Sequence, residues 1–220
     1  QDVIKEFYQY CDTQTNELIS LFPSDTTIIV VSDHGAKRLV GGVCFNEWLI
    51  EQGFLSLESY PQEVTPIDKV SIDWSRTRAW GDGGYYGRLF LNVLGREPQG
   101  IILPEDYEDV RRELISKIEA IEDDKGRNIG SRAYRPEDLY KECNGIPPDL
   151  IVYFGDLEWR SVGSVGSKSI LTFENDIGPD DANHDWHGIF IISGSEPDNE
   201  YMESLDICKM NSLILGLMGA

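Results

Sequence analysis

The chain has 220 residues, of which 40% are apolar and 26% are charged, and its formal net charge is −20. This size and composition predict a soluble globular protein with a sizeable core, built as one domain or as one domain with an excursion. The negative charge argues against a nucleic-acid groove, because a polyanion is bound by clustered Lys and Arg. A small phosphate-bearing substrate is compatible with this charge if a metal ion supplies positive charge locally.

The four cysteines are widely separated and form no CxxC pair, which indicates free or buried thiols rather than a disulfide framework. Such thiols are typical of a reducing compartment and favour a cytoplasmic protein. The sequence shows no signal-peptide pattern and no apolar run approaching the roughly 20 residues that span a bilayer. We therefore expect no membrane partner, and the sequence indicates no particular oligomeric state.

The first part of the chain predicts a helix, a strand, a loop and a second helix. Residues 2–22 carry apolar side chains on one helical face, and residues 26–31 are an apolar run that predicts a buried strand. Gly41 and Gly42 predict a flexible stretch where backbone can approach a ligand, and residues 46–52 predict a short helix. This order suits an α/β sheet that binds ligands at the carboxyl ends of its strands.

The rest of the chain predicts strands interrupted by one long helix. The aromatic and Gly-rich stretch 73–96 predicts a strand pair, or an irregular loop that leads into a strand. A helix is predicted from Pro104, because acidic residues fill the first turn and an apolar face follows. The remaining expected elements are a turn at 123–126, a brief helix at 136–142, buried strands at 149–154 and 188–193, and a closing helix within 205–220.

Asp33 and His34 follow directly on the predicted strand at residues 26–31, within the tetrapeptide Ser32-Asp33-His34-Gly35. A carboxylate and an imidazole fixed at a strand end are suitable ligands for zinc or manganese. The pair alone is a weak signal, since an Asp that accepts from loop amides beside a surface His gives the same pattern.

The other two histidines of the chain, His184 and His187, stand just before the predicted strand at residues 188–193. Each imidazole of the chain therefore borders a predicted core strand, which indicates one composite metal site. The pair also has a purely structural explanation, in which one histidine is hydrogen-bonded within the protein and the other is exposed to solvent. Spacing alone does not decide between His184 and His187.

A cluster of aromatic and Arg side chains has two interpretations. It can line a substrate pocket, with aromatic faces for a base and guanidinium groups for phosphate. Packing in the core and loops is the more common role of such residues. The cluster comprises Trp74, Arg76, Trp80, Tyr85, Tyr86 and Arg88.

The Gly- and Ser-rich stretch 160–169 has the glycine spacing of a phosphate-binding loop but departs from the Walker pattern. That pattern requires a Gly directly before the Lys and a helix immediately after it. Here Ser167 precedes Lys168, and the residues that follow are not helical in pattern. We therefore interpret this stretch as a flexible surface loop.

Four segments in a fixed order carry a family resemblance whose span covers most of the chain: residues 28–36, 46–50, 91–100 and 184–188. They resemble the alkaline phosphatase superfamily, and within it the type I phosphodiesterase and nucleotide pyrophosphatase group. The resemblance implies a three-layer α/β/α sandwich with a mostly parallel central sheet. It also implies a small phosphate-ester or nucleotide substrate and two divalent metal ions, zinc above all, with manganese as an alternative.

The resemblance assigns roles to individual residues. Asp33 and His34 match the Asp-His pair on the metal that also binds the nucleophile in that family. His184, four residues before Gly188, matches the histidine on the other metal. His187 is the second candidate for that role. Its alternative role is to contact a metal ligand or the substrate.

One departure from the family pattern is large. The family's nucleophilic Thr or Ser and three further metal ligands lie well before the Asp-His pair, where this chain has only one predicted helix. The chain therefore resembles the C-terminal part, residues 1–220, of a phosphodiesterase domain, with residues 61–145 as a candidate excursion or cap. With three or four of about eight metal donors, we expect this fragment to be inactive alone.

In the complete enzyme, the resemblance implies attack by a metal-activated hydroxyl on phosphorus and hydrolysis of the phospho-enzyme by water. Two alternatives remain. One is a non-catalytic binding or scaffold domain that retains the fold, and the other is a sulfatase or phosphomutase of the same superfamily. An upstream segment or partner chain that carries a Thr or Ser nucleophile would favour the enzyme. Its absence would favour the scaffold.

Overall fold

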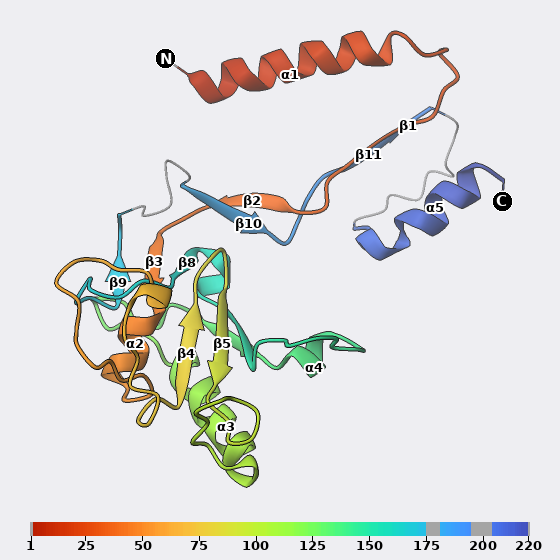
Figure 1. Ribbon diagram of the computed structural model, residues 1–220. Helices are drawn as coiled ribbons and strands as arrows, with labels where there is room; N and C mark the ends of the chain where they lie inside the picture. The colour runs from red at the N-terminus through yellow and green to blue at the C-terminus, as the bar shows by residue number, and fades with distance from the viewer. Residues whose placement is uncertain (1, 175–180, 195–203, 220) are drawn as a thin grey trace. The chain divides into compact units, whose positions relative to one another are not determined.

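The computed structural model describes residues 2–174, 181–194 and 204–219 (Figure 1). The chain divides into two compact units, a smaller one of residues 1–35 with 186–220 and a larger one of residues 36–185. Asp33 and His34 therefore belong to the smaller unit and His184 belongs to the larger. The candidate excursion at residues 61–145 lies wholly inside the larger unit, and its role as a cap stays a prediction.

The smaller unit is built on a strand pair and two helices. Strand β1 pairs antiparallel with β11, so that Ile28 lies opposite Ser193 and Val31 opposite Phe190. The helices and strands predicted for these segments are confirmed. Their bounds are α1 Val3–Ile19, β1 Ile28–Val31, β11 Phe190–Ser193, the 3₁₀ turn η4 Ile207–Lys209 and α5 Met210–Leu217.

The described residues of the larger unit form a four-stranded sheet in the order β4-β5-β7-β6 and a three-stranded sheet in the order β8-β3-β9, together with the pair β10-β2, whose strand β2 begins at Gly35, the last residue of the first segment of the smaller unit. These strands are β2 Gly35–Arg38, β3 Gly41–Cys44, β4 Ala79–Asp82, β5 Gly87–Leu91, β6 Arg132–Tyr134, β7 Leu150–Tyr153, β8 Trp159–Val162, β9 Leu171–Thr172 and β10 Ala182–Asp185. The helices of the larger unit are α2 Phe45–Glu51, α3 Tyr107–Glu119 and α4 Pro136–Leu139, with 3₁₀ turns η1 Ile67–Lys69, η2 Pro104–Asp106 and η3 Gly155–Leu157.

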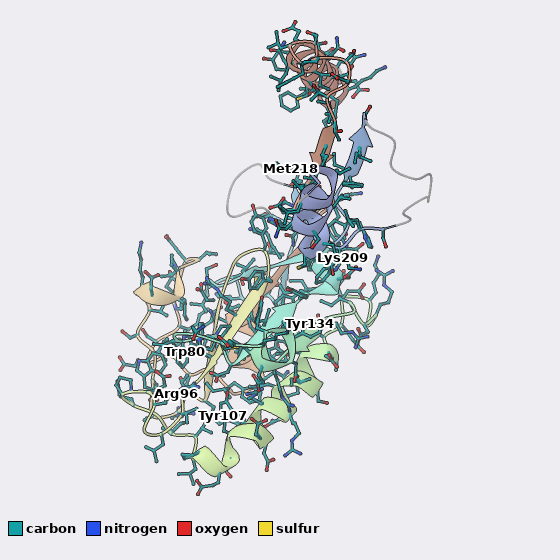
Figure 2. All side chains as sticks on the ribbon, turned by 90° about the vertical axis from the view of Figure 1, so that its right-hand side faces the viewer. Trp80, Arg96, Tyr107, Tyr134, Lys209 and Met218 are labelled. Carbon is teal, nitrogen blue, oxygen red and sulfur yellow. The ribbon has the colours of Figure 1, made fainter. Side chains whose placement is uncertain are left out.

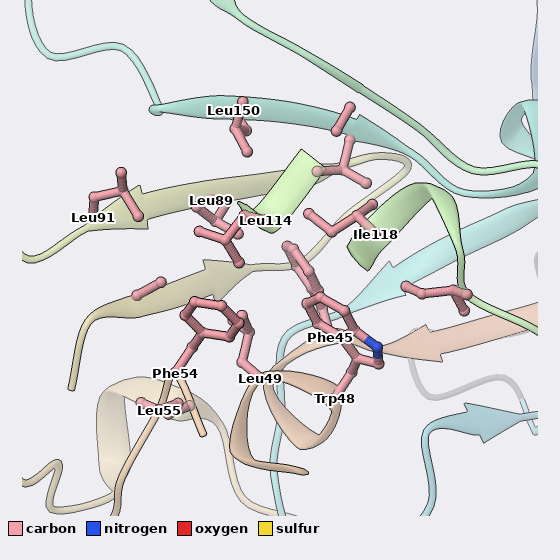
Figure 3. Close-up of a cluster of buried hydrophobic side chains, with 14 of the residues drawn as sticks. Phe45, Trp48, Leu49, Phe54, Leu55, Leu89, Leu91, Leu114, Ile118 and Leu150 are labelled. Carbon is pink, nitrogen blue, oxygen red and sulfur yellow. The ribbon is translucent and has the colours of Figure 1, made fainter. Parts of the chain in front are cut away.

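The core of the larger unit lies between the four-stranded sheet and helices α2 and α3 (Figure 3). From the helices, Leu49 and Leu114 are fully buried, and they face the fully buried Leu89 and Leu150 of the sheet. Helix α3 forms because Pro104 begins the turn η2 and the buried side chains recur at helical spacing. The core therefore fixes both helices against one face of this sheet.

The expectation of a mixed α/β chain is confirmed, whereas the mostly parallel central sheet of a three-layer sandwich is not confirmed. Among the described residues, β3 and β8 run parallel. The pairings within the four-stranded sheet, β3 with β9, and β1 with β11 are antiparallel. In the described part of the chain, no helix combines the length and the apolar character needed to cross a membrane.

Two Gly-rich stretches were expected to be flexible, and this was wrong for residues 41–42 and for residues 160–162, which lie in strands. Gly41 and Gly42 begin β3, where an added Cβ would lie 2.6 Å from the Thr172 carbonyl oxygen and 2.8 Å from Val162 Cγ2. These glycines therefore permit close packing of strands rather than loop movement. In the stretch 160–169, residues 160–162 belong to the buried strand β8, and the residues after Val162 form a loop as expected.

Candidate functional site

The end of β1 is hydrogen-bonded to the segment that precedes β11. The Ser32 backbone N–H donates to the Ile189 carbonyl oxygen at 3.1 Å, and the Ile189 N–H donates to Ser32 Oγ at 2.8 Å. Strand pairing therefore continues one residue beyond Val31. Asp33 and His34 emerge directly after this fixed point, as the sequence predicted for a strand end.

Gly188 lets the two segments approach closely. A Cβ atom added there would overlap Ser32 Oγ and would lie 3.1 Å from the His34 carbonyl oxygen. The backbone carrying His187 and Gly188 therefore runs directly against the backbone that carries Asp33 and His34.

A Gly188→Ala substitution is expected to destabilise this junction by about 1–3 kcal/mol, because the added methyl group overpacks it. Thermal unfolding of the full-length protein measures the effect. The matched control is Gly216→Ala in α5, where an added Cβ meets nothing within 4 Å. Equal melting temperatures for the two variants would contradict the close approach at Gly188.

The geometry of Asp33 and His34 fits two ligands of one metal ion. His34 Nδ1 lies 2.7 Å from the Gly35 carbonyl oxygen, which only accepts hydrogen bonds, so Nδ1 carries the proton in this contact. Such a bond orients Nε2 for a metal. His34 Nε2 lies 3.6 Å from Asp33 Oδ1, close to the about 3.3 Å that separates two ligands of a tetrahedral zinc ion.

Asp33 and His187 both line a cavity of about 550 Å³ in the smaller unit. Asp206 also lines this cavity, and the Cys208 backbone N–H, which donates to its carboxylate, holds the pKa of Asp206 below its usual range. The sequence did not single out Asp206, although an acidic residue just before a helix is a common cap. The remaining lining residues are Val31, Ser32, Trp186, Gly188, Ile189, Phe190, Ser204, Leu205, Ile207 and Met210.

His184 lies on strand β10 of the larger unit and is half-buried. The ring of Tyr85 packs edge-on against it, with the two ring centroids 4.3 Å apart. The neighbouring Asn183 is 3% exposed and accepts a hydrogen bond from the His184 backbone N–H at 2.8 Å. The structure thus places the two predicted metal-binding segments in different units, and their convergence stays a prediction.

Beside His184, Lys37 joins β2 to two carboxylates. Its Nζ lies 3.2 Å from Asp156 Oδ2 and 3.2 Å from Asp185 Oδ1. Burial lowers the pKa of Lys37, but the hydrogen bonds to Asp185 and Asp156 raise it more, so the pKa lies above the ordinary value. Lys37 therefore stays charged and ties β10 to the turn η3.

The aromatic cluster singled out in the sequence divides into separate groups. Trp74 packs edge-on against Trp80, with ring centroids 5.1 Å apart, and Trp80 stacks on Phe90 at 5.6 Å. Tyr86 packs edge-on against Tyr153. Of the residues in this cluster, Tyr85 contacts a predicted metal ligand, His184.

The Gly- and Ser-rich loop after β8 binds an internal carboxylate. Glu47 Oε1 accepts from the backbone N–H groups of Gly166 at 2.6 Å and Ser167 at 3.0 Å, and from the Tyr60 hydroxyl at 2.7 Å. Burial and the hydrogen bond to Glu47 raise the pKa of Tyr60. The amides that resembled a phosphate cradle in sequence therefore hold a side chain of α2, and Glu47 is only 7% exposed.

Replacing Glu47 with alanine is expected to lower the free energy of unfolding by about 2 kcal/mol, because buried donors lose their acceptor. Amide hydrogen exchange at Gly166 and Ser167 is expected to accelerate. The control is Glu51→Ala, a substitution of an exposed acidic residue of the same helix. Unchanged exchange at both amides would show that Glu47 does not hold this loop.

Within residues 2–174, 181–194 and 204–219, no three His, Cys, Asp or Glu side chains gather in a group that could hold a metal ion. None of the four cysteines, all of which lie in the described residues, forms a disulfide; Cys44 is buried and the other three are exposed. Of the three predicted ligands, Asp33 and His34 lie close to one another, and their role as ligands stays a prediction.

The family model described as "Type I phosphodiesterase / nucleotide pyrophosphatase" matches residues 1–189. The chain belongs to this family. The resemblance predicted from the sequence is thereby confirmed, and at family level the activity is that of a phosphodiesterase- or pyrophosphatase-type hydrolase. No curated protein and no solved structure matches the chain. The matched range includes Asp33 and all three histidines.

Proposed function

We propose that this chain supplies ligands to a metal-dependent phosphoric ester hydrolase in its full-length form. Asp33 and His34 hold one divalent ion and His184 holds the second. The observation that carries the proposal is the geometry at the end of β1, where His34 Nε2 and Asp33 Oδ1 are 3.6 Å apart in a chain of this family.

The donor set favours zinc, with manganese as the alternative. Imidazole nitrogen and carboxylate oxygen suit both ions, and a histidine that donates its second nitrogen to a backbone carbonyl is typical of zinc sites. When bound, the ions supply Lewis-acid stabilisation of the charged oxygens of a phosphate ester. The substrate class is therefore a small phosphate ester or nucleotide.

The residues of this chain bind and orient rather than attack. Asp33 and His34 directly follow strand β1, and His184 lies on strand β10, which supports a role in holding ions. The nucleophilic hydroxyl and the remaining ligands belong to another segment of the complete domain, whose fold we propose to be the three-layer sandwich. We propose that the 220-residue chain is inactive without that segment.

Hydrolysis of bis-p-nitrophenyl phosphate by the full-length protein, with zinc or manganese added to metal-free enzyme, tests the proposal. We expect cleavage that depends on the added ion. Stoichiometric metal binding without cleavage of phosphodiester or monoester substrates would instead identify a scaffold domain. The intact mass of the protein from its native source establishes whether a further segment exists.

A further inference from the structure

Asn183 connects three backbone segments around His184. Its Nδ2 donates to the Leu157 carbonyl oxygen at 2.8 Å and to the Tyr85 carbonyl oxygen at 3.1 Å, while its Oδ1 accepts from the His184 N–H. Asn183 is 3% exposed, so water does not compete strongly for these bonds. One side chain therefore fixes β10 to the turn η3 and to the turn that carries Tyr85.

The turn that carries Tyr85 is itself held in place. The N–H groups of Gly84 and Ser161 each donate to the other residue's carbonyl oxygen at 2.9 Å. A Cβ on Gly83 would lie 2.6 Å from the Gly163 nitrogen, so the turn sits directly on the strand β8 and the residue after it. Tyr85 is thus presented to the His184 ring by a rigid turn, although its side chain is 47% exposed.

The turn η3 has a strained backbone, and hydrogen bonds from Lys37 and Asn183 hold it in place. Asp156 and Leu157 have positive φ angles of 53° and 68°, and this conformation is uncommon for a bulky residue such as Leu. Such strain persists where surrounding contacts impose it, and it is often found at functional sites. Lys37 Nζ donates to the Asp156 carbonyl oxygen at 3.0 Å, and Asn183 donates to that of Leu157.

The contacts also favour one orientation of the imidazole. His184 Nδ1 lies 3.5 Å from Asn183 Oδ1, on the side of the ring that faces its neighbour. The edge-on contact with Tyr85 restricts rotation of the ring. Together these contacts direct Nε2 away from Asn183.

Given the proposed role of His184 as a ligand, we infer that Asn183 and Tyr85 are the positioning residues that orient its imidazole toward the metal ion. Neither touches the metal or the substrate in this role. Residues that orient a metal ligand through one intervening contact typically change metal affinity by about 10–100-fold when removed. Asn183 acts through the β10 backbone, and Tyr85 acts through its ring.

Zinc affinity of the full-length protein, measured by competition with a chromophoric chelator, tests the inference. We expect Asn183→Ala and Tyr85→Leu each to weaken binding of one of the two zinc ions by about 10–100-fold. Tyr85→Phe retains the ring contact and is expected to keep the wild-type affinity. Thermal unfolding of the metal-free variants separates this effect from loss of the fold.

The matched control is Asn92→Ala. Asn92 is 1% exposed, and its Nδ2 donates to the carbonyl oxygens of Trp74, Thr77 and Gln99 without contacting β10. We expect this variant to lose stability, as Asn183→Ala does, while zinc affinity stays unchanged.

The outcomes distinguish the two proposals. If His184→Ala weakens binding of one zinc ion but Asn183→Ala and Tyr85→Leu do not, the positioning role is wrong and the ligand assignment stands. If His184→Ala leaves both zinc affinities unchanged, the proposed function itself is wrong. Equal losses of affinity in the Asn183→Ala and Asn92→Ala variants would show a purely structural role.

Discussion

Replacing Asp33 with alanine is expected to reduce metal-dependent phosphodiester cleavage by the full-length protein at least about 10³-fold, which corresponds to about 4 kcal/mol of transition-state stabilisation. In the proposed site the carboxylate has no substitute within the pair, because His34 alone would supply one of the two proposed donors. The measurement is kcat/KM for bis-p-nitrophenyl phosphate at saturating zinc. A comparable loss is expected for His184→Ala, which removes the proposed ligand of the second ion.

The control for this loss is Asp25→Ala, which removes an exposed carboxylate of the same unit. We expect its kcat/KM to match the wild-type value. If Asp33→Ala or His184→Ala retained wild-type cleavage, the assignment of that residue as a ligand would be wrong. An intermediate loss that high zinc concentrations restore would identify weakened metal affinity as the cause.

Replacing Asp149 with alanine is expected to lower the free energy of unfolding by about 3 kcal/mol, the largest stability effect predicted here. Asp149 is 4% exposed and accepts from Arg96 Nη1 and Nη2, both at 2.7 Å, from the Tyr107 hydroxyl at 2.6 Å and from the Leu91 N–H at 2.6 Å. Figure 2 shows Arg96 and Tyr107 close to one another. The substitution leaves these donors without their acceptor.

The pKa directions agree with this arrangement. The hydrogen bonds to Asp149 raise the pKa of Arg96, and burial, followed by the hydrogen bond to Asp149, raises the pKa of Tyr107. Urea unfolding of the full-length protein measures the loss of stability. The control is Asp82→Ala, which removes a half-exposed partner of Arg88 and is expected to cost at most about 1 kcal/mol. A cost below 1 kcal/mol for Asp149→Ala would contradict a structural role for this network.

Strong hydrophobic periodicity made most of the helices and core strands predictable. Residues 2–22 and the segment after Pro104 form helices as expected, and the apolar runs near residues 28 and 150 form strands. The strands β2, β3 and β10 were missed, because their polar or Gly-rich sequences lack the alternation of a half-buried strand. Their pairing depends on partners more than 100 residues away, which local patterns do not contain.

The candidate ligands were predictable from their positions, since Asp33 and His34 directly follow an apolar run. The residues that contact the candidate ligands could not be predicted from their positions in the sequence. The Asn183 side chain donates to the carbonyl oxygens of Leu157 and Tyr85, over separations of 26 and 98 residues. Glu47 likewise occupies the Gly-rich loop from 119 residues away.

Anomalous diffraction at the zinc absorption edge, from crystals of the full-length zinc-loaded protein, tests the central claim most directly. We predict two peaks about 3.5–4 Å apart. One should lie within about 2.3 Å of an Asp33 carboxylate oxygen and His34 Nε2, and the other within the same distance of His184 Nε2. Zinc bound elsewhere, or Asp33 and His184 on opposite sides of the molecule, would contradict the account.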